Sequence, residues 1–254
     1  SSLINGGRLV KGSETISAYL DSDDIETINF GTMGHQIDQS YHAYQQKLHK
    51  FNATDIIVGL TIGEIDGIQN MFIPFRWRNE AGLPYIKPRF KASGQGLELV
   101  SAPYTKMLSR IPDSPELLEL LKENDKFYSN FIMFKRFGMT PLGRAVHTFY
   151  TKANALYKYY HVDTGGFLLL GRIMKSFKEE ASKNQARIFY LIMPDKNQLG
   201  WKEEGFKRPD LYQLMIQRLK KQELDTIDVR EILLASGIEE NDLFDSAGVH
   251  YSPI

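Results

Sequence analysis

Four short segments of the chain combine glycine with charged or imidazole side chains, the residue types that binding and catalytic loops need. They are Gly6–Gly12, Gly31–Gln36, Gly63–Asp66 and Asp245–His250. The first three directly follow apolar runs that are typical of strands. In a doubly wound parallel sheet, ligands bind beyond the carboxyl ends of the strands, where the strand order reverses. We therefore expect these four loops to meet in one site.

The elements that must position these loops alternate between β-rich apolar runs and amphipathic helices. The expected strands are Leu3–Asn5, Glu26–Phe30, Asp55–Ile62, Arg187–Met193 and Thr226–Val229. Apolar residues from Ile37 to Leu48 recur at spacings of three and four, which predicts a helix, and Phe167 to Ala181 repeat that pattern. This alternation predicts an α/β fold with a parallel sheet that is covered on both faces.

An interval of approximately residues 67–165 interrupts the alternation. Runs around Ile86 and Leu97, joined by Ser93–Gly96, predict a β-hairpin. Helical patterns follow at Glu116–Lys122 and Leu142–Tyr160. We expect an insertion that packs over the strand ends, within a single domain that spans residues 1–254.

The same interval gathers cationic and aromatic side chains. They are Arg76, Arg78, Lys87, Arg89 and Lys91, with Trp77, Tyr85 and Phe90. If these residues form a solvated face, they bind nothing. If they form a lid, the guanidinium groups would pair with acidic groups and the aromatic rings would pack against a sugar. Both interpretations stay open.

Composition excludes several classes of function. The 31 Lys+Arg equal the 31 Asp+Glu, which argues against nucleic acid as the main partner. Cysteine is absent, so there is no disulfide framework, thiolate metal site or cysteine nucleophile. His35, His42 and His49 share a heptad spacing that drifts around a helix and brings no acidic partner, so no metal site is expected.

No apolar run approaches the roughly 20 residues that a membrane-spanning helix needs. The sequence begins at Ser1 without a leader-like segment. Removal of a leader or anchor would favour an extracytoplasmic or periplasmic location. The oligomeric state is not predicted.

Longer stretches around these loops occur along the chain in the same order as the conserved sequence blocks of a known protein family. The stretches are Asn29–Gln39, Thr54–Val58, Gly63–Asp66, Tyr85–Phe90, Gly96–Val100 and Val249–Pro253. Together, across nearly the whole chain, they resemble the SGNH (GDSL-like) hydrolase family, in the subgroup with a long insertion. Tyr85–Phe90 and Gly96–Val100 resemble the hairpin of that insertion.

The resemblance implies a flavodoxin-like three-layer α/β/α sandwich that cleaves esters without a cofactor or a metal. It implies that His250 is the catalytic base, that Asp245 orients it, and that the backbone N–H of Gly34 donates to the oxyanion. The remaining residues of the loops would line the pocket. They are Gly7, Arg8, Glu64 and Asp66.

Three positions depart from the family's pattern. Arg8 stands where the nucleophilic serine belongs, and Ile65 replaces an oxyanion asparagine. Ala247 occupies the position of the acid before the histidine, so the nearest acid is Asp245, five residues before His250. A guanidinium stays protonated and cannot attack an ester, although at the mouth of a pocket it can hold a carboxylate, sulfate or phosphate.

Two functions therefore stay open. The first is an SGNH-like ester hydrolase or O-acyl transferase that acts on an acylated carbohydrate or a similar small ester. The alternative is a catalytically inactive module that binds a glycan or anionic ligand through Arg8 and the insertion. The two differ in whether any serine is activated. Ser13, the hydroxyl nearest to Arg8 among those after the loop, is expected to be a helix N-cap rather than a nucleophile.

Overall fold

The computed structural model shows a mixed α/β protein made of two compact units. The described residues are 11–32, 34–76, 86–102, 114–129, 132, 140, 142–143, 145, 165–199, 211–238, 243–244 and 251. The first unit combines Ser1–Glu64 with Met174–Ile254, and the second unit is Ile65–Ile173. The second unit contains the whole of the interval 67–165 that interrupts the sequence pattern.

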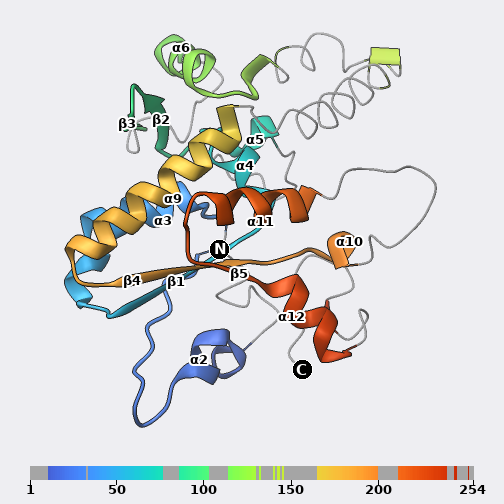
Figure 1. Cartoon of the computed structure of the whole chain (residues 1–254). Coiled ribbons are helices and arrows are strands. Elements are labelled where there is room, and N and C mark those ends of the chain that lie inside the picture. Colours follow the sequence, from blue (N-terminus) through green and yellow to red (C-terminus); the bar gives the residue numbers. More distant parts are fainter. Residues whose placement is uncertain are drawn as a thin grey trace. The chain divides into compact units, whose positions relative to one another are not determined.

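A parallel sheet of three strands organises the first unit (Figure 1). Its order is β1 (Asp55–Leu60), β4 (Arg187–Ile192) and β5 (Thr226–Asp228). The pairing of β1 with β4 is parallel along all six residues, and β4 pairs with β5 in the same direction. The α/β class predicted from the alternation is confirmed, and each strand ends one or two residues earlier than expected.

Helices surround this sheet. In chain order they are η1 (Gly12–Glu14), α2 (Ile16–Leu20), α3 (Ile37–Gln46), η2 (Leu48–Phe51), α9 (Gly165–Lys183), α10 (Lys196–Leu199), α11 (Leu211–Lys221) and α12 (Val229–Ser236). Helix α9 begins in the second unit and reaches the first at Met174. Figure 1 shows α3, α11 and the C-terminal part of α9 on one side of the sheet, with α12 on the other.

The buried face of the sheet explains why these helices pack there. Alternate residues of β4, namely Ile188, Tyr190 and Ile192, are at most 2% exposed. Phe177 of α9 lies 5.3 Å from the ring of Tyr41 in α3, so the apolar faces of the two helices meet. Burial of such side chains contributes about 1.5–3 kcal/mol each. The hydrophobic periodicity of both helices therefore reflects core packing.

The expected strand at Glu26–Phe30 is wrong, because these residues have no regular secondary structure. The N–H of Thr27 donates to Asp21 Oδ1 at 2.9 Å, and its hydroxyl donates to the carbonyl of Ser17 at 2.7 Å. Side-chain hydrogen bonds of this kind offer the backbone an alternative to a ladder. Leu3–Asn5 lies outside the described residues.

The expected N-cap at Ser13 is also wrong. Ser13 lies inside η1, and the cap of α2 is Thr15, whose Oγ1 accepts the N–H of Ala18 at 3.3 Å. The Thr15 hydroxyl in turn donates to the carbonyl of Gly12. The observed cap, Thr15, is therefore two positions after the expected one.

The second unit contains short helices and a hairpin. They are α4 (Glu64–Gly67, whose first residue belongs to the first unit), α5 (Ile73–Arg76), β2 (Arg89–Ser93), β3 (Gly96–Val100) and α6 (Pro115–Asn124). Strands β2 and β3 are antiparallel, which confirms the predicted hairpin. Gly94, at the turn, has a φ of +55°, a conformation that glycine adopts readily. The expected helix at Leu142–Tyr160 lies almost entirely outside the described residues.

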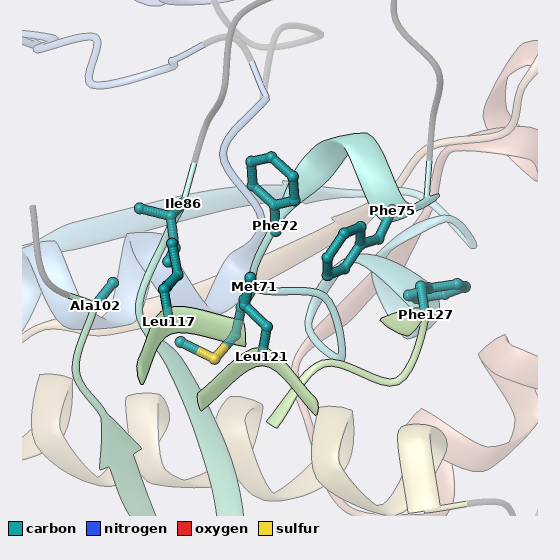
Figure 2. Close-up of a cluster of buried hydrophobic side chains, with 8 residues drawn as sticks. All are labelled: Met71, Phe72, Phe75, Ile86, Ala102, Leu117, Leu121 and Phe127. Carbon is teal, nitrogen blue, oxygen red and sulfur yellow. The ribbon is translucent and has the colours of Figure 1, made fainter. Parts of the chain in front are cut away.

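A hydrophobic cluster forms the core of the second unit (Figure 2). Met71, Leu117 and Leu121 converge at its centre, and each is 0% exposed. The carboxylate of Asp125 lies beside this cluster. Its Oδ2 accepts the N–H groups of Met71 and Phe72 at 2.7 Å each, together with the amide of Asn70 at 2.9 Å.

Candidate functional site

Glu64 connects two of the expected loops at the carboxyl end of β1. Its side chain is 4% exposed, and its Oε2 accepts the backbone N–H of Ile37, the first residue of α3, at 2.8 Å. With its amide nitrogen toward Glu64, the Gln36 side chain donates to Oε2 and Oε1 at 3.0 and 3.2 Å. A carboxylate at this position satisfies an N–H that the helix leaves unpaired and stabilises the positive end of its dipole. Glu64 therefore fastens the loop after β1 to the start of α3.

Gly34 lies just before this capped helix end. Its φ is +73°, and a Cβ added to it would meet no atom within 4 Å. The residue is exposed, and its N–H donates to no acceptor in the described part of the chain. The position therefore offers a backbone donor to solvent or a ligand, next to the positive end of the α3 dipole.

We expect Gly34→Ala to lower the free energy of unfolding by about 1 kcal/mol, because a side chain disfavours positive φ although the space around it is open. Urea denaturation would measure the loss. A matched variant is Gly12→Ala, since Gly12 is equally open and does not have positive φ. Equal stability of the two variants would contradict the role assigned to the left-handed conformation.

The carboxyl end of β4 lies beside that of β1 and is followed by Pro194, which Tyr251 contacts. The N–H of Met193 donates to the carbonyl of Leu60 at 2.7 Å. The hydroxyl of Tyr251 donates to the carbonyl of Pro194 at 2.6 Å, and its ring lies 4.7 Å from that of Phe244. Burial, with a smaller contribution from Asp195, raises the pKa of the Tyr251 hydroxyl.

A polar network follows at the end of β5. Tyr212 of α11 is 0% exposed, and its hydroxyl lies within hydrogen-bond distance of the Ile192 carbonyl and of Asp228 Oδ1. The Arg230 guanidinium lies over the Tyr212 ring, 4.6 Å from its centroid. The single hydroxyl proton of Tyr212 therefore has two acceptors within reach. Burial raises the pKa of Tyr212, so the hydroxyl stays protonated. The network ties α11 to both β4 and α12.

Three tyrosines, the buried Tyr190 and Tyr212 and the half-buried Tyr251, predict a loss of stability at high pH. Burial raises the pKa of each above the ordinary value of 10.0. Above about pH 10 the unfolded chain releases these protons while the folded chain keeps them, so stability falls as pH rises, by about 1.4 kcal/mol per pH unit for each tyrosine. Urea denaturation between about pH 8 and 11 would measure this slope. Tyr190→Phe should reduce it by one tyrosine's share, and an unchanged slope would contradict this account.

Several of the expected site residues lie outside the described residues. They are Gly7, Arg8, Arg78, Asp245 and His250, together with the side chain of Arg76. The structure therefore brings together the loops at Gly34 and Glu64, and it places Tyr251, the residue after His250, at the end of β4.

The other expected residues belong to the second unit. The carbonyl of Asp66 accepts the N–H of Gln69 at 3.1 Å. Lys87 is 4% exposed, so it lies inside the unit and not on a solvated face. Nη1 of Arg89 donates to the carbonyls of Gln69 and Asn124 at 2.9 and 2.7 Å. Arg89 therefore joins two segments of this unit.

The sequence reasoning missed residues at the ends of β4 and β5. Asp195 caps α10 by accepting the N–H of Gln198 at 3.1 Å, and Asp228 caps α12 by accepting the N–H of Glu231 at 3.3 Å. Asp195 lies three residues after the end of β4, and Asp228 is the last residue of β5, so the rule that sites lie at the carboxyl ends could have found them. Tyr212, the second residue of the amphipathic helix α11, carries no such signal.

The described part of the chain contains no group of three or more histidine or acidic side chains placed to hold a metal ion. None of the helices in the described ranges has the length and apolar character needed to cross a membrane. No family model matches this sequence, and neither curated proteins nor solved structures include a significant match.

Proposed function

We propose that the chain is an SGNH-like ester hydrolase or O-acyl transferase, with a flavodoxin-like sandwich, that acts on an acylated carbohydrate or a similar ester. One observation carries this proposal: residues of three of the resemblance stretches, Asn29–Gln39, Gly63–Asp66 and Val249–Pro253, lie at the carboxyl ends of the neighbouring parallel strands β1 and β4. Glu64 holds the start of α3 there, and Tyr251 is bound to Pro194 at the end of β4. This edge is where doubly wound sheets bind ligands.

The family resemblance assigns the roles. His250 directly precedes Tyr251 in the sequence, so the bond from Tyr251 to Pro194 supports an imidazole at this edge. The exposed N–H of Gly34 is a donor suited to an oxyanion, and the α3 dipole strengthens it. The resemblance gives Asp245 the role of accepting the other imidazole N–H and orienting the ring.

The reaction needs a hydroxyl nucleophile, which Arg8 cannot supply. A serine Oγ attacks the ester carbonyl as His250 takes its proton, and the alcohol leaves when the imidazolium returns that proton. Water or an acceptor hydroxyl then attacks the acyl-serine and regenerates the serine. Candidates that flank the first loop are Ser1, Ser2 and Ser13, and Arg8 serves as an anion contact at its mouth.

Hydrolysis of an acetylated oligosaccharide and of a small activated acetyl ester tests this function. His250→Ala should lower kcat/KM by about 10²–10⁴-fold, the contribution of a general base. His49→Gln is the matched control, because it removes an imidazole from η2, beyond the other end of α3. Equal rates for the wild type and His250→Ala would contradict the proposal.

A further inference from the structure

A pocket of about 830 Å³ opens in the second unit, between β2 and the C-terminal end of α6. Strand β2 contributes Arg89 and Lys91, and α6 contributes Lys122, Glu123 and Asn124. Clefts of about 300–1,000 Å³ are the size that binds small-molecule ligands. All of its described lining residues belong to this unit.

The lining of the pocket is cationic. Among the described lining residues, four are cationic (Arg89, Lys91, Lys122 and Lys126) and two are acidic (Glu123 and Asp125). The carboxylate of Asp125 bonds to groups inside the protein, because the residue is 5% exposed and its oxygens accept four N–H groups. The described lining therefore presents an excess of positive charge, and Glu123 is its other acid.

Neighbouring groups hold two of these cations in place. The Lys126 ammonium donates to Gln69 Oε1 at 2.9 Å, and the Arg89 guanidinium bonds to the carbonyls of Gln69 and Asn124. Lys91 lies two residues beyond Arg89 on the same face of β2. Its ammonium has no hydrogen bond or ion pair within the described residues, so it is the donor best placed for a ligand. Preordered cations reduce the entropy that ligand binding costs.

The other lining groups restrict the class of anion. Tyr128 is half-buried and contacts Phe75 edge-on at 5.7 Å, which leaves part of its ring at the pocket. Aromatic rings of this kind pack against the apolar faces of sugars. Glu123, Ser129 and Gln69 can accept hydrogen bonds from hydroxyl groups, and the negative charge of Glu123 repels a compact dianion such as phosphate more strongly than a singly charged carboxylate.

We propose that this pocket binds a carboxylate-bearing saccharide, that is, a uronate unit of an acidic polysaccharide. The carboxylate pairs with Lys91 and Lys126, and the hydroxyl groups face Glu123 and Ser129. This inference rests on the second unit alone and holds whether or not the chain cleaves esters.

Isothermal titration calorimetry of the whole chain with a tetrauronate tests the proposal. A neutral tetrasaccharide is the control for a sugar without charge. A short polyglutamate is the control for carboxylates without a sugar. We expect saturable binding of the uronate alone, and Lys91→Gln should weaken it at least about tenfold, as loss of a charge-assisted hydrogen bond does. Lys175→Gln, an exposed change of equal charge on α9 outside the pocket, should leave it unchanged.

Three outcomes would overturn the proposal. They are absence of uronate binding, equal binding of the neutral saccharide or of polyglutamate, and equal weakening by Lys91→Gln and Lys175→Gln. Lys122→Gln is a second variant at the rim, where the side chain is 58% exposed, so it removes charge without disturbing the core. Unchanged thermal transitions for these surface variants would confirm that they are folded.

Discussion

Asp125→Ala is expected to unfold the second unit under conditions in which the wild type is stable. The variant leaves four N–H donors without their acceptor, from Asn70, Met71, Phe72 and Phe127. Each unsatisfied buried donor costs about 1–3 kcal/mol, and loss of a buried, hydrogen-bonded charge typically costs about 3–5 kcal/mol in total. A loss of this size is comparable with the entire stability of many domains.

Hydrogen exchange localises this effect. The amides of Leu117 and Leu121, in the core of the second unit, should lose protection, while those of α3 in the first unit keep it. Glu123→Ala is the control, because it removes an exposed carboxylate two residues away and should change stability by less than about 0.5 kcal/mol. Similar exchange in the two variants would show that Asp125 does not hold this core together.

Glu64→Ala is expected to weaken both the fold and the candidate site. It removes the acceptor of the Ile37 N–H and the partner of the Gln36 amide, which should cost about 2–3 kcal/mol. The start of α3 then loses its attachment to the loop after β1, so Gly34 loses its fixed position as a donor. We expect faster exchange in the first turn of α3 and a lower kcat.

Glu64→Gln separates the two contributions of this residue. A glutamine oxygen still accepts the Ile37 N–H but lacks the charge that stabilises the helix dipole, so about 0.3–1 kcal/mol of the loss should remain. Urea denaturation of both variants measures the difference. If Glu64→Ala is as stable as the wild type, the carboxylate is not a structural cap.

Elements whose signal is local could be predicted from the sequence. Asp55–Leu60 and Arg187–Ile192 are runs of apolar residues that include β-branched ones, and both form strands. The helical spacing of Ile37, Tyr41 and Tyr44 was sufficient to predict α3, because one face of that helix is buried against Phe177.

Predictions from the sequence were wrong where hydrogen bonds to residues elsewhere in the chain determine the local structure. Thr27 bonds to Ser17 and Asp21, which keeps Glu26–Phe30 out of the sheet despite its strand-like composition. Glu64 was expected to line a pocket, but its carboxylate accepts the N–H of Ile37, 27 residues away. Such contacts between polar groups leave no periodic trace in the sequence.

The candidate site likewise contains one contact that was expected from the sequence and others that were not. The loops around Gly34 and Glu64 were expected to meet, and the Glu64–Ile37 bond joins them, although Glu26–Phe30, the strand expected before Gly31, does not form. The network of Tyr212, Asp228 and Arg230 was not anticipated, since it depends on the order of the strands and on the position of α11. The roles of Arg8, Asp245 and His250 stay predictions.

The central claim is that a serine of this chain is activated by His250, and labelling with a serine-directed fluorophosphonate tests it most directly. Intact mass should show a single stoichiometric adduct, and peptide mapping should place it on one serine. The adduct should disappear in His250→Ala and persist in His49→Gln. Absence of an adduct on wild-type protein whose circular dichroism shows a folded chain would contradict the proposed chemistry.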